Sequence, residues 1–465
     1  MKFLDSLLMS GKEVLPLVEG GKGISATNGM SAGAWAAAGG VGTVSCVNAD
    51  DFDENGEVIP QIYHGKTRIE RHQELIKYGT DGGIRQVQDA HEMAKGNGRI
   101  HINVLWEMGG AEEILHGVLE KTKGLVHGVT CGAGMPYKLS EIAAQHEVFY
   151  HPIISSARAF GILWKRAYKK YGQWLGSVVY EDPWLAGGHN GLSNAEDPTE
   201  PQDPYPRVAA LRKIMNSFGL QKVPIIMAGG VWYLRDWAHW FNNPEIGPIA
   251  FQYGTRPLLT KESPIPKIWK DALTKLKEGD ILLHKFSPTG FYSSAVHNNL
   301  LRCLEGRTER QLSFSAKVTE DFPAEIQTAK RSYYVKGEDK PKAEQWLAAG
   351  YSEAMKTPDG TLIFVRPESA REIRQDQKDC MGCLSSCRFS NWSQNPETKY
   401  STGRGADPRS FCIQKTLMDI AHGGSLENNL MFAGHAAYNF STDPFYSNGF
   451  VPSVKELIER IVSGD

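Results

Sequence analysis

The sequence predicts an α/β protein whose main domain is a (β/α)8 TIM barrel, with an inserted or appended cap that carries cysteines. Three observations lead to this fold class. Short β-branched runs alternate with longer helix-like segments through roughly the first 260 residues. Eight such runs can be counted, which is the number that closes a barrel. Glycines follow many of the runs, and barrels place their active sites at those strand ends.

The eight expected strands are short and apolar, as strands buried on both faces are. They cover residues 15–18, 41–47, 100–106, 125–130, 147–154, 175–180, 223–228 and 248–253. Helical patterns between them cover residues 112–121, 137–145, 157–171 and 208–218. A doubly wound sheet is the competing fold, but it usually has fewer strands and carries its glycine motif after the first strand only.

The rest of the chain divides into loops, a cap and a C-terminal segment. Two long loops, 50–57 and 194–206, are rich in acidic residues, and the second also in proline. Solvated surface loops are the favoured interpretation, and a lid over the barrel mouth is the alternative. We predict a TIM-barrel domain at 1–300, a cap with the cysteines at 301–424, and a segment at 425–465 whose amphipathic helix, 453–462, returns to the barrel.

Composition excludes several classes of protein. The 51 Lys+Arg and 53 Asp+Glu residues give a formal charge of -2, so the chain lacks the basic field of a nucleic-acid binder. With 41% hydrophobic and 22% charged residues, the chain is not disordered as a whole. Asp5 and residues 11–13 interrupt the N-terminal apolar stretch, which therefore lacks a signal-peptide core. Residues 30–49 fit a small-residue helix and a strand better than a membrane span, so we expect a cytoplasmic protein without a membrane partner.

Glycines mark the ends of the seventh and eighth expected strands. Gly229 and Gly230 follow the seventh, and Gly254 with Thr255 follows the eighth. In barrels these two loops present backbone N–H groups to a phosphate, and glycine allows the backbone to approach it closely. Glycine that merely ends a strand is the simpler alternative for either pair alone. The two together indicate a phosphate site.

His189 follows the sixth expected strand and is framed by glycines. Gly187 and Gly188 precede it, and Gly191 follows shortly after. An imidazole at a strand end reaches the barrel mouth, where its near-neutral pKa suits proton transfer from a carbon acid or a hydrogen bond to a cofactor carbonyl. A lone histidine is more often a packed or surface residue. The glycine frame and the strand end favour a catalytic role.

Four of the seven cysteines lie together late in the sequence. Cys380, Cys383, Cys387 and Cys412 supply the full ligand set of a [4Fe–4S] cluster or of a tetrahedral zinc ion. Three close cysteines with a distant fourth favour the iron–sulfur cluster, since zinc more often uses two separated Cys-x2-Cys knuckles; free thiols are the third alternative. The other three, Cys46, Cys131 and Cys303, are most simply packing residues.

Taken together, these motifs resemble the nitronate monooxygenase (2-nitropropane dioxygenase) family of FMN barrels, which also contains FMN-dependent enoyl-ACP reductases. The resemblance covers about residues 14–300 and the C-terminal helix. It is carried by LPLVEGG at 15–21, AAAGGVGT at 36–43, Asn103, GAG at 132–134, AGGHNG at 186–191, PIIMAGG at 224–230, and QYGTRPLLTKES at 252–263.

The resemblance implies a flavoprotein oxidoreductase, a monooxygenase or a reductase, with FMN at the barrel mouth. It implies that FMN is held by Gly20, Gly21, Asn103, Gly187, Gly188, Gly229, Gly230, Gln252, Gly254 and Thr255. His189 would be the catalytic base or the group that orients the substrate. Lys22 stands where many relatives have methionine, and it could meet an anionic substrate or the flavin; a surface lysine is the alternative. Asp182 and Leu185 stand where relatives often carry polar residues, ahead of the AGGH motif, and they are counted as further departures.

The Cys-x2-Cys-x3-Cys run resembles the iron–sulfur motif of 2,4-dienoyl-CoA reductases, in which a cluster supplies electrons to the flavin. Three functions follow from the two resemblances. The first is nitronate-monooxygenase-like oxidation of a small-molecule substrate; the second is reduction of an enoyl or dienoyl thioester, with NAD(P)H as a transient donor; the third is non-catalytic redox sensing. A cluster favours reductive chemistry. The sequence also allows two protein partners, an electron-donor protein and a second copy of the chain in a homodimer.

Overall fold

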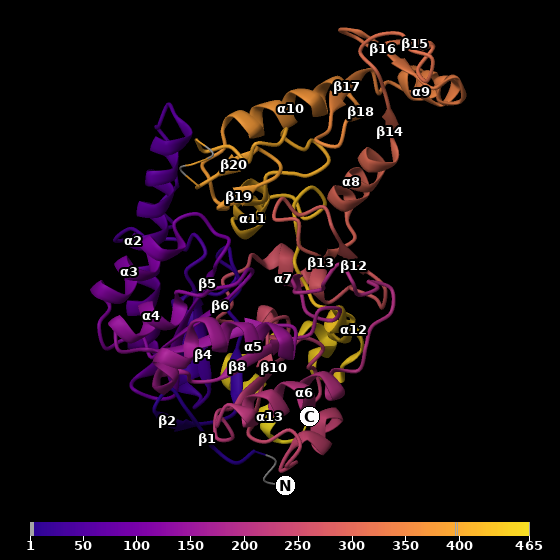
Figure 1. Cartoon of the computed structure of the whole chain (residues 1–465). Helices are drawn as coiled ribbons and strands as arrows, with labels where there is room; N and C mark the ends of the chain where they lie inside the picture. Colours follow the sequence, from indigo (N-terminus) through magenta and orange to yellow (C-terminus); the bar gives the residue numbers. More distant parts are fainter. Residues whose placement is uncertain (1–3, 396, 398, 465) are drawn as a thin grey trace.

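The computed structural model describes residues 4–395, 397 and 399–464, so the first three residues of the predicted barrel domain and the last residue of the predicted C-terminal segment lie outside it. Eight parallel strands form a closed barrel in the order β10-β11-β3-β4-β5-β6-β7-β8. Helices surround it, and the cap rises from one end (Figure 1). The predicted (β/α)8 barrel is therefore confirmed.

All eight predicted runs form barrel strands, with ends that differ by up to three residues. The strands are β3 (Leu17–Glu19), β4 (Val41–Ser45), β5 (Arg99–Leu105), β6 (Gly128–Gly132), β7 (Phe149–Ile154), β8 (Val178–Glu181), β10 (Ile225–Ala228) and β11 (Ile249–Tyr253). Nearly all of their residues are buried, because helices cover the outside of the barrel and side chains fill its interior.

Helices form the outer layer of the barrel. They are α1 (Gly29–Ala37), α2 (Arg68–Ala94), α3 (Ala111–Lys121), α4 (Leu139–Gln145), α5 (Ala157–Arg166), α6 (Pro204–Ser217) and α13 (Val454–Val462). Three of them begin at a capping box, Asn28 with Ser31 for α1, Thr67 with Glu70 for α2 and Ser453 with Glu456 for α13, which satisfies the first backbone N–H groups. The predicted helix 157–171 is interrupted at Ala167, whose backbone is not helical, and continues as a 3-10 helix, Tyr168–Trp174.

A hairpin closes the barrel at the end opposite the cap. Its strands are β1 (Leu7–Met9) and β2 (Lys12–Val14), and its turn places Ser10 inside the barrel. The Ser10 hydroxyl lies 2.8 Å from His101 Nε2 and 3.0 Å from His151 Nε2, and the two rings stack at 4.2 Å between centroids. Both rings are fully buried, so burial lowers the pKa of His151 to about 3 and lowers that of His101 well below its usual value.

This buried pair predicts a pH-dependent stability. Between pH 6.5 and about 3, the unfolded chain binds a proton at His151 that the folded protein does not, so stability falls as the pH falls. Compared with His151→Gln, the wild type should lose about 1.4 kcal/mol of unfolding free energy per pH unit in this window. Urea unfolding at pH 7, 6 and 5 measures the difference. A difference that does not change with pH would contradict the assignment.

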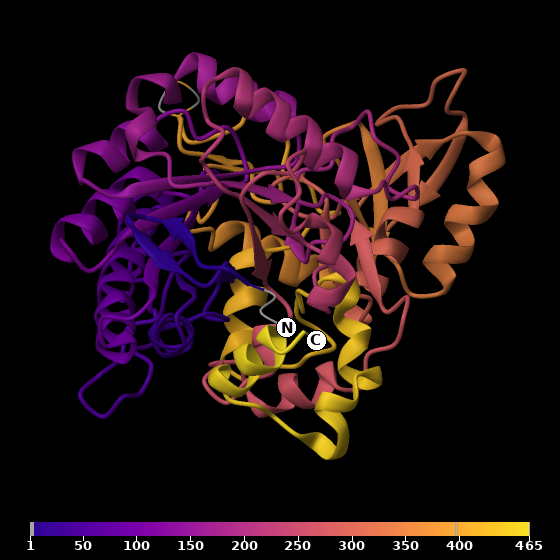
Figure 2. The same ribbon diagram turned by 90° about the horizontal axis from the view of Figure 1, so that it is seen from below.

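The cap contains a small α/β module joined to the barrel through α8 (Asn299–Glu309), so the predicted boundary at residues 300 and 301 falls inside a helix. Its sheet has the order β14-β18-β17, and a hairpin, β15–β16, packs beside it. The elements are β14 (Gln311–Ser313), β15 (Ala324–Gln327), β16 (Ser332–Val335), α9 (Lys340–Ala348), β17 (Glu353–Lys356), β18 (Thr361–Val365) and α10 (Pro367–Lys378). The view from below shows the module to one side of the barrel (Figure 2).

The cysteine-bearing segment lies between this module and the barrel (Figure 1). It contains β19 (Ser386–Cys387) and β20 (Trp392–Ser393), and it leads into α11 (Ile413–Ala421). The chain then returns to the barrel through α12 (Asn439–Thr442) and α13. Apolar residues of α13, including Leu457 and Ile461, belong to the main barrel core, as the amphipathic pattern predicts.

Smaller elements complete the barrel mouth. A three-stranded sheet joins β9 (Gly188–His189), β13 (Ser293–Val296) and β12 (Ile281–His284), and α7 (Lys267–Leu273) precedes it. The two predicted loops are largely exposed at 54–57 and 195–203, as surface loops are. Within the part of the chain that the structure describes, none of the helices has the length and apolar character needed to cross a bilayer.

Candidate active site

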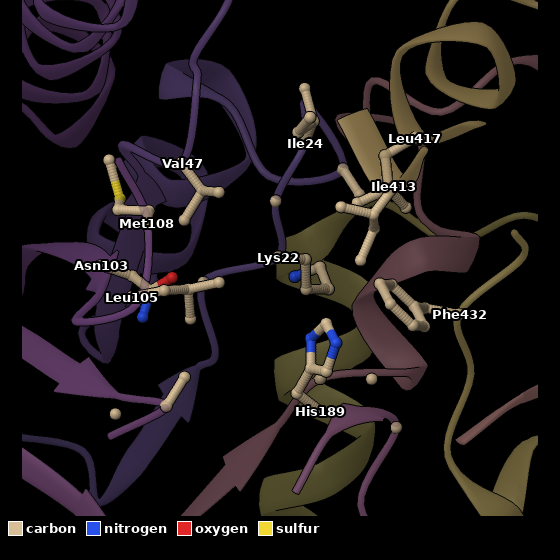
Figure 3. Close-up of a pocket in the computed structure, with 18 of the residues that line it drawn as sticks. Lys22, Ile24, Val47, Asn103, Leu105, Met108, His189, Ile413, Leu417 and Phe432 are labelled. Atoms are coloured by element: carbon tan, nitrogen blue, oxygen red, sulfur yellow. The ribbon is translucent and has the colours of Figure 1, made fainter. Parts of the chain in front are cut away.

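A pocket lies at the C-terminal ends of the barrel strands, with cap residues over it. Nine of the residues predicted to be catalytic or to bind the cofactor line it: Gly21, Lys22, Asn103, Gly187, Gly188, His189, Gln252, Gly254 and Thr255. Figure 3 shows Asn103, Leu105 and Met108 on one side of the pocket and Ile413, Leu417 and Phe432 on the other. The side chains of Lys22 and His189 lie between these two walls. The fold thus gathers residues from widely separated parts of the chain at one mouth.

Three predicted cofactor residues lie just outside the pocket lining. Gly20 packs behind Gln252, where a Cβ atom would come 2.9 Å from the amide nitrogen of that side chain. Gly229 and Gly230 have φ values of +93° and +76°, which other residues rarely adopt. Among the described residues, no acceptor is found for the backbone N–H groups of Gly229, Gly230 and Gly254. Such N–H groups at neighbouring strand ends are suited to bind a phosphate.

His189 is held in place by the small sheet and by a serine. As part of β9, His189 pairs with Ser293 of β13. Its Nε2 atom lies 2.6 Å from the Ser287 hydroxyl, which in turn lies 2.9 Å from the Thr289 hydroxyl. The ring also meets the Phe432 ring edge to face at 5.6 Å. Burial lowers the pKa of His189 to about 4, so the imidazole is neutral at pH 7 and able to accept a proton.

Lys22 forms a buried ion pair beneath the pocket. Its Nζ atom donates to Glu19 Oε1 at 3.0 Å and to the Gly20 carbonyl oxygen at 3.0 Å. Only 1% of the Glu19 side chain and 15% of the Lys22 side chain are exposed, so Lys22 is not a surface lysine. Burial raises the pKa of Glu19 and lowers that of Lys22, and the attraction between the two charges opposes both shifts. The pair fixes the loop that follows β3.

Replacing Lys22 with methionine is expected to leave Glu19 buried without its counter-ion. The unfolding free energy should fall by about 3–5 kcal/mol at pH 8, and by less at pH 5, where Glu19 takes up a proton. Turnover should change more than FMN content. The double variant Glu19→Gln/Lys22→Met removes both charges and should recover most of the stability, measured by urea unfolding. An unchanged rate in Lys22→Met would remove Lys22 from the mechanism.

Glu181 lines the pocket but was missed by sequence reasoning. It is the last residue of β8, next to Asp182, whose side chain instead accepts hydrogen bonds from the backbone N–H groups of Trp184 and Leu185. Burial, and to a smaller extent the charge of Asp182, raises the pKa of Glu181 to about 8. Its carboxyl group is therefore largely protonated at pH 7. The only signal in the sequence was a polar residue directly after an apolar strand.

The four late cysteines lie close to one another at the edge of the pocket. Cys383 lines the pocket, and its thiol interacts electrostatically with those of Cys380, Cys387 and Cys412. Each sulfur accepts at least one hydrogen bond, for example from the Ser390 hydroxyl to Cys380 Sγ at 3.0 Å. In the described part of the chain, no three His, Cys, Asp or Glu side chains are arranged to hold a single metal ion. The predicted metal site therefore stays a prediction.

The remaining cysteines differ in their surroundings. Cys46 and Cys131 are fully buried in the main core, and burial raises the pKa of both thiols. Cys303 is exposed on α8, where its thiol faces Asn299 at 3.8 Å. The prediction that Cys303 is a packing residue is wrong, because it lies on the solvent-facing side of that helix.

Comparison with protein families matches the nitronate monooxygenase model to residues 90–464. The chain belongs to the nitronate monooxygenase family. As a member of this family, the protein is an FMN-dependent oxidoreductase. The match includes Asn103 of β5, His189 of β9 and Gln252 of β11, and it extends through the cap to α13.

Solved structures with a TM-score of 0.50 share the fold at low sequence identity. FabK from Thermotoga maritima has a TM-score of 0.50 at 15% identity, over 97% of this chain and 92% of that one. The enoyl reductase domain of MlnA from the macrolactin biosynthesis cluster of Bacillus amyloliquefaciens has a TM-score of 0.50 at 12% identity, over 97% and 93%. Nitroalkane oxidase from Streptomyces ansochromogenes has a TM-score of 0.43 at 17% identity, over 62% and 78%. The comparison with curated proteins found no match.

The residues at the barrel mouth fit FMN. The backbone N–H groups of Gly229, Gly230 and Gly254, which have no acceptor within the described part of the chain, would hold its phosphate. Asn103 and Gln252 offer amide groups to a polar ring edge, and Gly21 lets the backbone approach Asn103 so closely that a Cβ atom would come 2.4 Å from its side chain. Apolar side chains such as Leu105 and Met108 complete the wall.

Proposed function

We propose that this family member reduces an alkene conjugated to a carbonyl, with electrons supplied through an iron–sulfur cluster on Cys380, Cys383, Cys387 and Cys412. The observation that supports this most directly is the position of Cys383, which lines the same pocket as His189 and Asn103. A redox centre at that wall would lie next to the flavin. When bound, FMN would accept electrons one at a time and transfer two to the substrate.

The spacing of the cysteines along the chain favours a cluster over zinc. Three close cysteines with a distant fourth are typical of an iron–sulfur cluster, whereas a structural zinc ion more often uses two separated Cys-x2-Cys pairs. The folded chain brings the thiols near enough to one another to interact electrostatically. The surrounding N–H and O–H donors, such as Ser390, would stabilise the sulfur charge.

The chain's own residues divide the proton chemistry between two groups. His189 is neutral at pH 7 and can accept a proton or hydrogen-bond a substrate oxygen, with Ser287 fixing its ring. Glu181 is largely protonated at pH 7 and can donate a proton to the carbon that becomes electron-rich. Groups whose environments shift their pKa values in opposite directions are suited to act as base and acid.

Nitronate oxidation is the second candidate. It is favoured by the family match and by the neutral His189, which could deprotonate a nitroalkane. A cluster would be of no use to an enzyme that passes electrons from substrate to oxygen. Redox sensing without catalysis is the third, and a pocket that holds both Glu181 and His189 argues against it.

Two measurements on protein purified without air test the proposal. The visible spectrum and the metal content should show FMN and about four iron atoms per chain. Reduction of an enoyl thioester, driven by NAD(P)H or by an electron-donor protein, should then exceed oxidation of propionate 3-nitronate. Nitronate turnover without iron would overturn the reductive proposal. A protein whose flavin is reduced and reoxidised at the same rates with and without substrates would be a sensor.

A further inference from the structure

The cap supplies one apolar wall of the pocket, and the residues of this wall were not predicted from the sequence. Helix α11 begins directly after Cys412, and three of its buried side chains, Ile413, Leu417 and Ile420, line the pocket. In Figure 3, Ile413 and Leu417 face the pocket from the side opposite Asn103 and Leu105. This wall is suited to the apolar part of a substrate.

One more residue of α11 lines the pocket, and it is polar. Gln414 is 5% exposed, and its backbone N–H donates to the Cys383 thiol. Its side-chain nitrogen has no hydrogen-bond partner among the residues that the structure describes. A buried amide without a partner is unfavourable, so native proteins rarely keep one unless a ligand or water completes it. The missing partner is an acceptor, because an amide nitrogen only donates.

We propose that the Gln414 carboxamide binds the oxygen of the substrate that is conjugated to the reacting carbon. That oxygen belongs to the carbonyl of an enoyl thioester or to an N–O group of a nitronate. The terminal torsion of glutamine is broad, so a small rotation can present the N–H2 group to a bound molecule. The inference rests on the proposed function for the identity of the substrate. It assigns to the cap a direct role in recognition.

The two substrates require the hydrogen bond at different stages. In enoyl reduction, the β carbon would receive a hydride equivalent from reduced FMN, the alkene electrons would move to the carbonyl oxygen, and the protein would supply a proton to the α carbon. The oxygen gains charge, so a donor stabilises the transition state and acts on kcat. In nitronate oxidation, the oxygen is already charged before the reaction, and the substrate would give up electrons to FMN. The same donor then stabilises the bound substrate and acts on KM.

The test compares Gln414→Met with Asp419→Ala, a control on the exposed side of the same helix. With crotonyl thioester, we expect Gln414→Met to lower kcat by about 10- to 100-fold. With propyl 1-nitronate, we expect KM to rise about 10-fold at similar kcat. Binding of unreactive butyryl thioester, followed through the flavin spectrum, should weaken about 10-fold in Gln414→Met only. Gln414→Glu keeps the size but loses the donor, and it should behave like Gln414→Met.

The outcomes separate the two proposals. If the wild type is active and Gln414→Met matches it in kcat, KM and butyryl thioester binding, the assignment of Gln414 is wrong. If the wild type turns over neither substrate, the proposed function is wrong. The comparison supports the assignment of Gln414 when each variant contains as much iron and FMN as the wild type. Equal losses in Asp419→Ala and Gln414→Met would also overturn the assignment, because a damaged helix would explain both.

Discussion

Replacing His189 with alanine should slow the chemical step by about 10²- to 10⁴-fold, because the reaction loses the imidazole that accepts or orients a proton. FMN content should stay close to that of the wild type, since the phosphate loops at Gly230 and Gly254 are untouched. Because burial lowers the pKa of His189 to about 4, the wild-type rate should not depend on titration of this group between pH 6 and 8. Single-turnover kinetics at several pH values measure both effects.

Ser287 provides the matched comparison for His189. Ser287→Ala removes the hydroxyl at 2.6 Å from Nε2 but leaves the imidazole in β9. We expect a smaller loss of rate than in His189→Ala. The dependence of the rate on pH should also change, because Nε2 loses its hydrogen-bond partner and the protonation of the ring changes with it. Undiminished activity in His189→Ala would place the base elsewhere, and Glu181 would be the next residue to replace.

Replacing Cys383 with serine should remove the iron and disconnect the flavin from its electron supply. We expect the iron content to fall from about four per chain to nearly zero, since a cluster of this type needs four thiolates. Turnover with a one-electron donor, such as reduced methyl viologen, should fall to background. Reoxidation of dithionite-reduced flavin by an enoyl thioester should keep its rate, because that half-reaction does not use the cluster.

Cys303→Ser is the matched control, since Cys303 is exposed on α8 and takes no part in the group of four. It should keep both iron and activity. Wild-type iron content in Cys383→Ser would refute the cluster assignment. One zinc atom per chain in the wild type would replace the cluster with a structural metal ion.

The barrel could be predicted from the sequence because each strand is a short apolar run and its end is marked by glycine or by a polar side chain. Helix α2 could not. It contains Gly79, Gly82 and Gly83, which normally disfavour helices. These glycines allow close packing: a Cβ atom on Gly82 would come 2.0 Å from the Ala49 carbonyl oxygen, and one on Gly83 would come 2.8 Å from Val118. The contacts that explain them lie far away in the sequence.

The same reason limits the prediction of the site. Motifs with local spacing, such as the glycines around His189 and the three close cysteines, can be recognised in the sequence alone. Glu181 and Gln414 have no local motif. Their properties depend on burial at a mouth where distant segments meet, and only the folded chain brings Gln414 to the pocket that Glu181 lines.

The position of α13 has a consequence for how the protein can be made. Leu457 and Ile461 pack in the same core as Trp35 of α1, although more than 400 residues separate them in the chain. During synthesis, part of the apolar surface of α1 therefore stays uncovered until α13 has left the ribosome. A chain that ends after the barrel strands would therefore lack α13, and it should aggregate rather than fold as a small flavoprotein.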